Sequence, residues 1–383
     1  MKFVKFLCLA TTCVVGSLTA NAAVYRVNNQ PGVDADFSDL SVAISTAVID
    51  DTLYVEGSVI SYGSITLNKR LNLIGAGFFI AANDSTQALP NSSRLDRLVI
   101  TASGSGSIIS GIEVRNTSTS TSTNQFGMVE LASGANNVSL IRCYFYHAAA
   151  GSSSSFNGAA LHLPTNVNNL VVSQCFIFQE RVTTSTSACY GTYAVLVGSN
   201  CSGLVFANNI VKLGNKTTVY DQACTQRAFS MNTSSSATIV SNVFMGRMDV
   251  FNSVFANNIQ ITGSMTASNS FAQNGNFPNV VQNNIGNSTQ FGTTNGNQSN
   301  VNMNDVFAYA PGNENVDNHY RLKAGSPAIG AGVSGIDCGA FGGDGPFKLS
   351  GLPAIPAIFE AVVPFQGNNA DGINITIKSK THE

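Results

Sequence analysis

The sequence predicts an all-β protein: a right-handed single-stranded parallel β-helix with an N-terminal capping helix and a C-terminal β-hairpin. Two observations predict this fold. The phrase "VSLIRCYFYH" (138–147) returns 32 residues later as "LVVSQCFIFQ" (170–179). Within each copy, apolar residues alternate with polar or small ones, which is the period of a strand and not of a helix. A chain that repeats short strands without intervening helices buries its apolar side chains by coiling, each turn stacked on the last.

Two columns of recurring residues define the period of the coil. The members of a column share one position in each copy of the phrase and follow one another at steps of 32 to 34 residues. The first column is Cys143, Cys175, Asn209 and Asn242, and Gly111 extends it upstream by a further step of 32. The second column is Leu131, Leu163, Val197 and Met231. Units of this length, without helices, hold about three short strands each.

The doubled asparagines at 208–209 and 257–258 predict a bend between two strands of each turn. Asparagine tolerates left-handed backbone angles, and its amide can hydrogen-bond to its copy one turn away. Because Cys143 and Cys175 share the column of the second asparagine, we expect both cysteines to fill the same bend.

Residues 1–22 predict a secretory signal peptide. Lys2 and Lys5 precede an apolar run that ends in an A-x-A cleavage site at 20–22. Without these two lysines, 17 basic residues face 21 acidic ones, a net charge of −4, which argues against nucleic acid as a partner. No later stretch holds 18 uninterrupted apolar residues, so no transmembrane segment is expected. The expected localisation is therefore secreted or cell-surface, and the oligomeric state is left open.

The mature chain divides into a β-helix over 23–347, with an N-terminal cap at about 23–60, and a C-terminal hairpin or cap over 348–383. The N-terminal cap contains an apolar pattern with helical spacing, and Asp36 or Ser38 is the expected N-cap residue. The residues of this pattern are Leu40, Ala43, Ile44, Ala47 and Val48. The Gly-rich stretch 325–347 is expected to close the repeats. The segments 353–365 and 372–380 predict two strands joined by a Gly/Asn/Asp turn.

The stretches "FSDLSVAISTAVIDDTLYVEG" (37–57), "SITLNKRLNLIGAG" (64–77) and "YRLKAGSPAIGAGVSGIDCGAFGG" (320–343) resemble pectate-lyase-like parallel β-helix proteins. The first two resemble the N-terminal helix and first turn of these proteins, and the third resembles the closing segment of exported bacterial members. The likeness covers roughly residues 25–345. It implies the fold and leaves the function open, because this fold hosts polysaccharide lyases, hydrolases, adhesins and passive surface proteins.

Glu130 and His162 are weak candidates for catalysis. They flank the second column and should face outward on neighbouring turns, at the position where the resemblance implies a sugar-binding cleft. A carboxylate beside an imidazole is a general acid–base arrangement, and it would raise the pKa of the histidine. The alternative is a surface cross-strand pair without chemistry.

The long loops of one face are the expected ligand-binding region. Tyr190, Tyr193 and Tyr220 could stack on sugar rings, or they could pack the loops onto the body. Their expected polar partners are Arg227 together with Arg181, Lys216 and Asp221.

Six cysteines remain after removal of the signal peptide. Cys189 and Cys224 lie in successive loops, 35 residues apart, and are the expected disulfide. Cys143 and Cys175 could pair or could stack as reduced thiols in the core. Cys201 and Cys338 have no obvious partner, and the spacings do not suggest a zinc site.

The catalytic residue sets of the resembling enzymes are missing. The resemblance implies either clustered acidic calcium ligands with an Arg or Lys base, or N-T-D, D-D and G-H-G elements. The outward positions offer a single Glu, and His162 is flanked by leucines. No cofactor is therefore expected, with calcium near Asp305, Asp317, Asp337 or Asp344 left as an alternative to a structural role.

The sequence favours an exported, non-catalytic β-helix that binds carbohydrate, such as a polysaccharide or cell-surface glycan, or another surface through its long loops. One alternative is a divergent polysaccharide lyase or glycoside hydrolase that uses Glu130 and His162. Another is a purely structural or adhesive solenoid.

Overall fold

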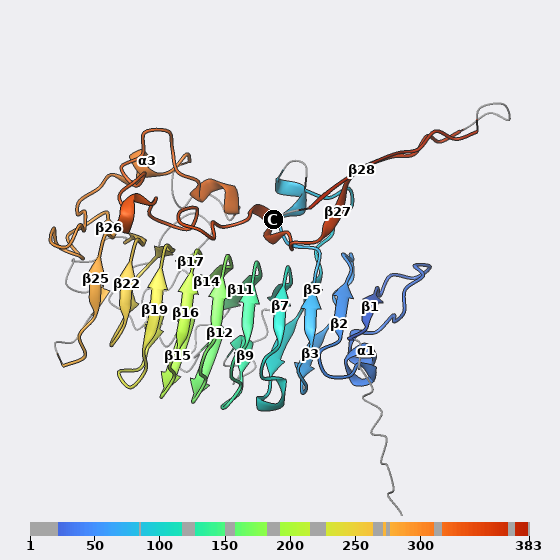
Figure 1. The fold of residues 1–383 in the computed structure, drawn as a ribbon, viewed down its shortest axis with the longest axis horizontal. Coiled ribbons are helices and arrows are strands. Elements are labelled where there is room, and N and C mark those ends of the chain that lie inside the picture. Colours follow the sequence, from blue (N-terminus) through green and yellow to red (C-terminus); the bar gives the residue numbers. More distant parts are fainter. Residues whose placement is uncertain are drawn as a thin grey trace, which may run out of the picture.

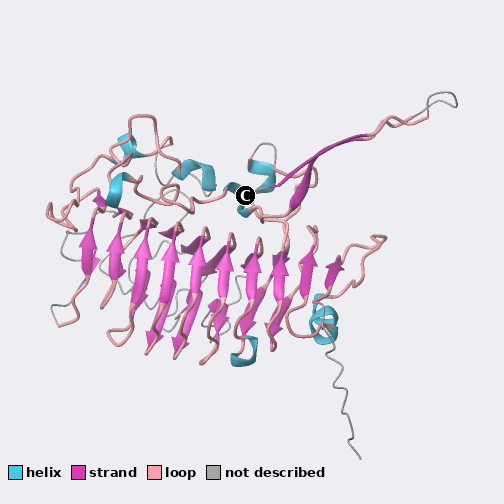
Figure 2. Cartoon of the chain, viewed as in Figure 1, coloured by secondary structure: helices cyan, strands magenta, loops and turns pink. Residues whose placement is uncertain are grey.

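The chain folds into a parallel β-helix built from three sheets (Figures 1 and 2). The computed structural model describes residues 22–83, 86–116, 127–149, 158–181, 192–214, 227–262, 271–272, 276–309, 316–366 and 372–381. Every neighbouring pair of strands in the three sheets runs parallel, and successive partners come from successive turns. The predicted fold is confirmed.

From β4 to β24, the chain visits sheet A, then sheet C, then sheet B in each turn. Sheet A consists of β1 (Val24–Val27), β2 (Thr52–Val55), β4 (Asn72–Ile74), β7 (Ile108–Ser110), β10 (Ser139–Ile141), β13 (Val171–Ser173), β16 (Leu204–Ala207), β19 (Ala237–Val240), β22 (Val254–Ala256) and β25 (Val280–Gln282). Sheet C consists of β5 (Arg94–Leu95), β8 (Glu113–Asn116), β11 (Tyr144–Ala149), β14 (Phe176–Arg181), β17 (Ile210–Gly214), β20 (Val243–Met245), β23 (Ile259–Ile261) and β26 (Ile285–Gly286). Sheet B consists of β3 (Ser64–Leu67), β6 (Arg97–Ile100), β9 (Gly127–Leu131), β12 (Gly158–Thr165), β15 (Thr192–Ser199), β18 (Arg227–Met231), β21 (Met248–Asp249) and β24 (Phe271–Ala272).

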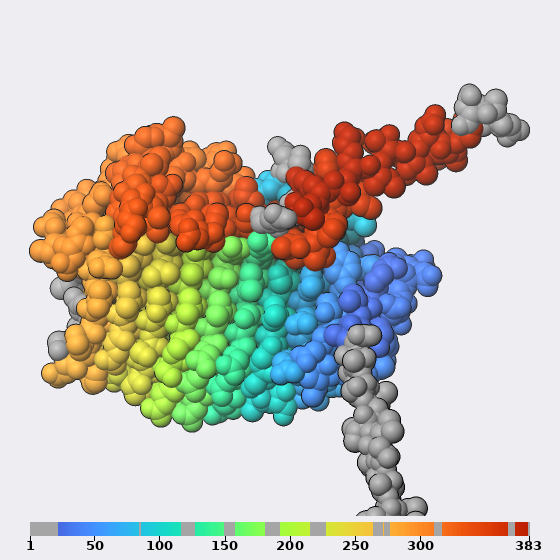
Figure 3. Space-filling model, in the orientation of Figure 1, coloured from blue at the N-terminus to red at the C-terminus, as the bar shows by residue number. Residues whose placement is uncertain are grey.

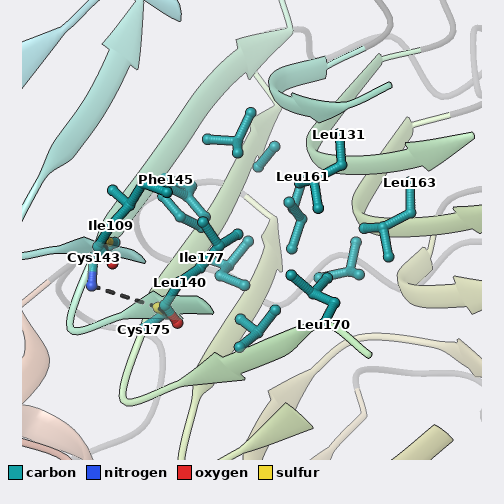
Figure 4. Packing of buried hydrophobic residues seen from close by; sticks show 14 of the residues in the cluster. Ile109, Leu131, Leu140, Cys143, Phe145, Leu161, Leu163, Leu170, Cys175 and Ile177 are labelled. Carbon is teal, nitrogen blue, oxygen red and sulfur yellow. Dashed lines mark hydrogen bonds between the residues drawn. The ribbon is translucent and has the colours of Figure 1, made fainter. Parts of the chain in front are cut away.

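The inward side chains of the three sheets form the core of the coil (Figure 4). All four members of the predicted second column are buried, and the strand register stacks three of them, Leu163, Val197 and Met231, directly on one another. Branched and aromatic side chains at inward positions suit this pleated, enclosed environment. The period-2 alternation in the sequence therefore corresponds to the inside and the outside of the coil.

A ladder of asparagines lines the bend from sheet A to sheet C. The Nδ2 of Asn209 donates to the Oδ1 of Asn242 at 2.9 Å, and the Nδ2 of Asn242 donates to the Oδ1 of Asn258 at 3.0 Å. Cys175 continues the ladder upstream, because its backbone N–H donates to the Oδ1 of Asn209. The predicted amide ladder, with the cysteines in its column, is confirmed.

One prediction about this column was wrong. The register pairs Ile141 with Ser110, so Gly111 lies beside Arg142 and not beside Cys143. The step here is 31 residues, from Gly111 to Arg142. Gly111 has a φ of 69° and Arg142 a φ of 55°, so this position of the bend takes a left-handed backbone. Gly111 therefore marks the turn itself, one residue before the column.

Residues 301–309 and 316–352, which we call the C-terminal strap, run along the outer face of sheet C (Figure 1). Outward side chains of sheet C, including Phe176 and Ile259, are buried against strap residues such as Phe307 and Cys338. The Gly-rich stretch 325–347 thus covers the side of the coil. Sheet C carries aromatic and aliphatic residues on both of its faces. Its outer face needs a cover because exposing an apolar surface of this size to water is costly.

The strap contains short helical segments and no long one. They are α3 (Met303–Val306) and the 3₁₀ turns Asp317–Tyr320, Val333–Gly335 and Leu349–Gly351. Two further 3₁₀ turns lie in the coil, at Ile80–Ala82 and Ala102–Gly104.

The predicted N-terminal helix is α1 (Leu40–Thr46), which contacts β1, β2 and β3. Its N-cap is Asp39, whose carboxylate accepts from the backbone of Ser41 and Val42, so the expectation of Asp36 or Ser38 was wrong. Leu40 and Ile44 are buried, whereas Val48 lies beyond the helix and is exposed. That this helix caps the coil stays a prediction.

The C-terminal segments form the predicted antiparallel hairpin of β27 (Pro356–Val362) and β28 (Thr376–Thr381). The hairpin extends away from the body of the molecule (Figure 3). A backbone hydrogen bond from Ala88 to Ile358 joins its base to the coil.

Candidate functional site

The outer face of sheet B carries a column of side chains that crosses six successive strands. The register aligns the members of this column one turn apart. From β6 to β21 they are Val99, Glu130, His162, Leu196, Ser230 and Asp249. Glu130 and His162 are therefore neighbours on the same face, as predicted.

Arg97, on β6, binds the Glu130 carboxylate. Its Nη2 lies 2.5 Å from Oε2 of Glu130, and its Nε donates to the backbone carbonyl of Gly127 at 3.1 Å. The two side chains are 28% and 24% exposed, so the ion pair is partly shielded from water. A charge-assisted bond of this kind is stronger than a hydrogen bond between neutral groups, and it fixes the orientation of the carboxylate.

Burial lowers the pKa of His162, and the negative charge of Glu130 only partly opposes this effect. Glu130 acts in the expected direction, but burial outweighs it, so the expected net rise in the pKa of His162 was wrong. The physical reason is that two effects oppose each other. Desolvation disfavours the imidazolium, and the attraction of the Glu130 carboxylate, which is already paired with Arg97, is too weak to compensate. At neutral pH the imidazole is uncharged.

Gly127 provides the space for this imidazole. A Cβ atom placed on Gly127 would lie 2.8 Å from the Cβ of His162 and 2.9 Å from the carbonyl oxygen of Val129. Contacts this close do not occur at real Cβ atoms, so glycine at 127 leaves room for the His162 side chain on the neighbouring strand.

Tyr193 and Arg227 form the second part of the face. Tyr193 lies on β15, not in a loop as expected, and the register places it beside Arg227 on β18. Burial raises the pKa of Tyr193, while Arg227 lowers it and Asp249 raises it. Tyr193 is therefore a neutral, half-buried ring with its hydroxyl protonated.

Asp249 lies between two arginines. The Nε of Arg227 is 2.6 Å from Oδ2 of Asp249, and the Nε of Arg247 is 3.6 Å from Oδ1. The side chains of Arg227 and Asp249 are 11% and 17% exposed. Like Glu130, Asp249 is thus held in place by a guanidinium from a neighbouring strand.

Arg97, Arg247 and Asp249 belong to this face but were not predicted as site residues from the sequence. Asp249 escaped the repeat search because the step from Ser230 to Asp249 is only 19 residues long, whereas the preceding steps in the column are 31 to 34 residues. Arg97 lies on the turn before Glu130, where the recurring phrase is not recognisable. A register search that allowed shortened turns would have found Asp249.

Several predicted site residues lie outside the described residues: Tyr190, Tyr220, Cys189, Cys224, Lys216 and Asp221. The side chain of Arg181 also lies outside them. The stacking role of the two tyrosines and the Cys189–Cys224 disulfide stay predictions.

The four described cysteines are buried free thiols. The backbone N–H of Cys143 donates to Sγ of Cys175 at 3.4 Å, so these two stack in the bend as reduced thiols (Figure 4). Cys201 fills a different bend, where its N–H donates to Oγ of Ser235. Cys338 belongs to the C-terminal strap, and its Sγ donates to the carbonyl of Asn283.

Among the described residues there is no group of three or more His, Cys, Asp or Glu side chains that could hold a metal ion. Asp317 is buried and accepts from Nδ2 of Asn83 and from the N–H of Ser350. It joins the strap to the coil. Within the same part of the chain, no helix is long and apolar enough to cross a membrane.

Comparison with known proteins gives a likeness of fold alone. No family model and no curated protein matches the sequence. Among solved structures, the chain is similar to pectate lyase Pel9A, with 12% identity, a TM-score of 0.42, and coverage of 84% of this chain and 97% of that one. It is also similar to a rhamnogalacturonan lyase, with 13% identity, a TM-score of 0.36, and coverage of 79% and 97%.

Proposed function

We propose that the protein is exported and binds carbohydrate on the outer face of sheet B without cleaving it. The observation that carries this proposal is the pairing of the two carboxylates on that face. Glu130 is bound by Arg97 and Asp249 by Arg227, so both carboxylates are held in fixed orientations. The face therefore presents hydrogen-bonding groups whose positions are fixed before a ligand binds.

The separation of the two carboxylates also argues against glycoside hydrolysis. Glu130 on β9 and Asp249 on β21 are four strands apart. At about 4.8 Å per strand, this is about 19 Å. Inverting and retaining glycosidases place their two carboxyl groups about 5 to 9.5 Å apart. Glu130 and Asp249 are too far apart to act as such a pair.

The same face suits the recognition of sugars. Tyr193 and His162 provide planar rings with polar edges, and Ser230, Arg97 and Arg227 provide hydroxyl and N–H donors. Binding sites of this kind combine flat apolar surface with a few placed polar groups. The signal peptide predicted for residues 1–22 supports export to a place where polysaccharides are found.

A lyase that uses His162 as a base is the second candidate. The lowered pKa of His162 favours it, because a neutral imidazole at pH 7 can accept a proton. A lyase would release unsaturated sugars, and His162→Gln would abolish their release while leaving ligand binding in place.

The test uses the mature protein, residues 23–383, on a panel of polysaccharides, with binding and released sugars measured in the same samples. Tyr193→Ala should weaken binding at least tenfold. Tyr54→Ala is the matched control, since Tyr54 is a half-buried tyrosine on the outer face of sheet A. Binding without product supports the proposal. Product formation that depends on His162 would establish the lyase instead, and a protein that binds no glycan would be left as a structural or adhesive solenoid.

A further inference from the structure

The charged side chains on the outer face of sheet B are arranged as two ion-paired ends with an uncharged middle. One end is Arg97 with Glu130, on β6 and β9, and the other is Arg227 and Arg247 with Asp249, at β18 and β21. Between them, β12 and β15 contribute His162, Tyr193 and Leu196. We call the side chains from Arg97 to Asp249 the sheet B stripe.

The cations of the stripe are already occupied by the protein's own carboxylates. Three arginines face two acids, so the stripe has a net charge of only +1 when His162 is neutral. A ligand carboxylate or sulfate would have to displace Glu130 from Arg97, or Asp249 from Arg227. It would leave the displaced, partly buried acid without its partner, which is costly. The arrangement of the stripe therefore disfavours the binding of an acidic ligand.

The length of the stripe indicates the length of its ligand. From β6 to β21 the stripe crosses five strand-to-strand steps. At about 4.8 Å per step, it spans about 24 Å along the axis of the coil. A single sugar covers only a fraction of this distance, whereas a linear oligosaccharide laid across the strands contacts both ends and the ring-bearing middle.

We propose that the sheet B stripe binds a neutral, linear polysaccharide laid along the axis of the coil, an inference that rests on the proposed carbohydrate-binding function. The Arg–carboxylate pairs at its two ends hydrogen-bond to sugar hydroxyls, and Tyr193 and His162 contact ring faces between them. The same pairs exclude uronic and sulfated polymers.

The experiment measures the affinity of the mature protein for neutral, uronic and sulfated oligosaccharides, each from disaccharide to octasaccharide, at low and high salt. We expect a neutral series to bind, with affinity that rises as the oligomer lengthens and changes less than twofold with salt, since no ligand charge is involved. The double variant E130Q/D249N should lose at least tenfold in affinity for the neutral ligand and should gain at least tenfold for the uronic one.

Glu56→Gln is the matched control. Glu56 also pairs with an arginine, since its Oε1 lies 2.6 Å from Nε of Arg26, but this pair lies beside sheet A and not in the stripe. It should change neither affinity. Wild-type protein that prefers a uronic or sulfated series, with affinity lost at high salt, would overturn this inference and leave the carbohydrate-binding function intact. A monosaccharide that binds as tightly as an octasaccharide would also overturn it. Failure of all three series to bind would overturn both proposals.

Discussion

Glu130 lies directly beside His162 on the neighbouring strand, yet its carboxylate is bound by Arg97, on the strand at its other side. The pair that suggests acid–base chemistry in the sequence is therefore a row of three residues. The arginine fixes the position of the carboxylate, and burial lowers the pKa of the imidazole. This row is suited to holding a ligand by fixed hydrogen bonds.

The first prediction concerns the pKa of His162. Glu130→Gln should lower this pKa further, because the carboxylate is the group that raises it against the effect of burial. Arg97→Gln should raise it, since Glu130 then acts on His162 without a competing cation. NMR titration of the imidazole signals measures both. His147, which bonds to Oε1 of Gln179 and whose pKa is also lowered by burial, serves as the internal control. A rise in Glu130→Gln would contradict the assignment.

The second prediction concerns Gly127. Gly127→Ala forces the new Cβ against His162 and the Val129 carbonyl, so it should destabilise the fold by about 1 to 3 kcal/mol and shift the His162 NMR signals. Gly345→Ala is the control, because its Cβ would meet nothing closer than 3.7 Å. Chemical denaturation measures the free energy of unfolding. Equal effects of the two substitutions would show that Gly127 has no special packing role.

The third prediction concerns the asparagine ladder. Asn242→Ala removes a side chain that donates to the carbonyls of Phe206 and Val240 and accepts from Asn209. Several buried polar groups lose their partner, so the free energy of unfolding should fall by about 2 to 5 kcal/mol. Asn72→Ala, on the outer face of sheet A with hydrogen bonds of 3.4 Å, should cost less than about 0.5 kcal/mol. A loss at Asn242 as small as that at Asn72 would refute the role of the ladder.

The fourth prediction concerns Lys212, which is fully buried on β17 above the ring of Phe178. Burial lowers its pKa from 10.5 to about 8, and Glu180 partly opposes this. Between these two values the unfolded chain binds more protons than the folded one, so the lysine's contribution to stability rises with pH through this window. Below about pH 8 the full cost of burying the ammonium group is present.

Lys212→Met should therefore stabilise the protein relative to wild type below pH 8, by on the order of 3 kcal/mol or less, and the gain should shrink toward pH 10.5. Denaturation at a series of pH values measures the difference. Lys378→Met is the control, because Lys378 is an exposed hairpin residue paired with Glu360. A difference that is constant over the whole pH range would contradict the lowered pKa.

The repeat in the sequence was sufficient to predict the coil and the inward columns. Parallel strands that stack turn on turn place equivalent residues in contact, so Leu163, Val197 and Met231 recur because each packs on the next. The same argument predicted the amide ladder and the juxtaposition of Glu130 and His162. The predicted position in the column was wrong by one residue at Gly111. Gly111 is the left-handed residue of the bend and lies one position before the column.

Other features depended on contacts that no repeat encodes. The C-terminal strap packs on the outer face of sheet C, a surface that forms only when the coil has folded. The aromatic residues of that face are covered by a segment far away in the chain. The pairing of Arg97 with Glu130 depends on the two side chains reaching one another across the sheet. Asp249 joins the stripe through a shortened turn that breaks the period.

The sequence by itself determined that this chain coils, which residues face inward, and which outward pair deserved a test. Periodicity suffices for these because stacking is local and repeats in every turn. Only the tertiary structure decided the surroundings of that pair. The pKa of His162 depends on how deeply its neighbours bury it, and the position of the Glu130 carboxylate depends on a guanidinium from another turn. The chemistry of the face is therefore set by side-chain placement, and the fold by the period.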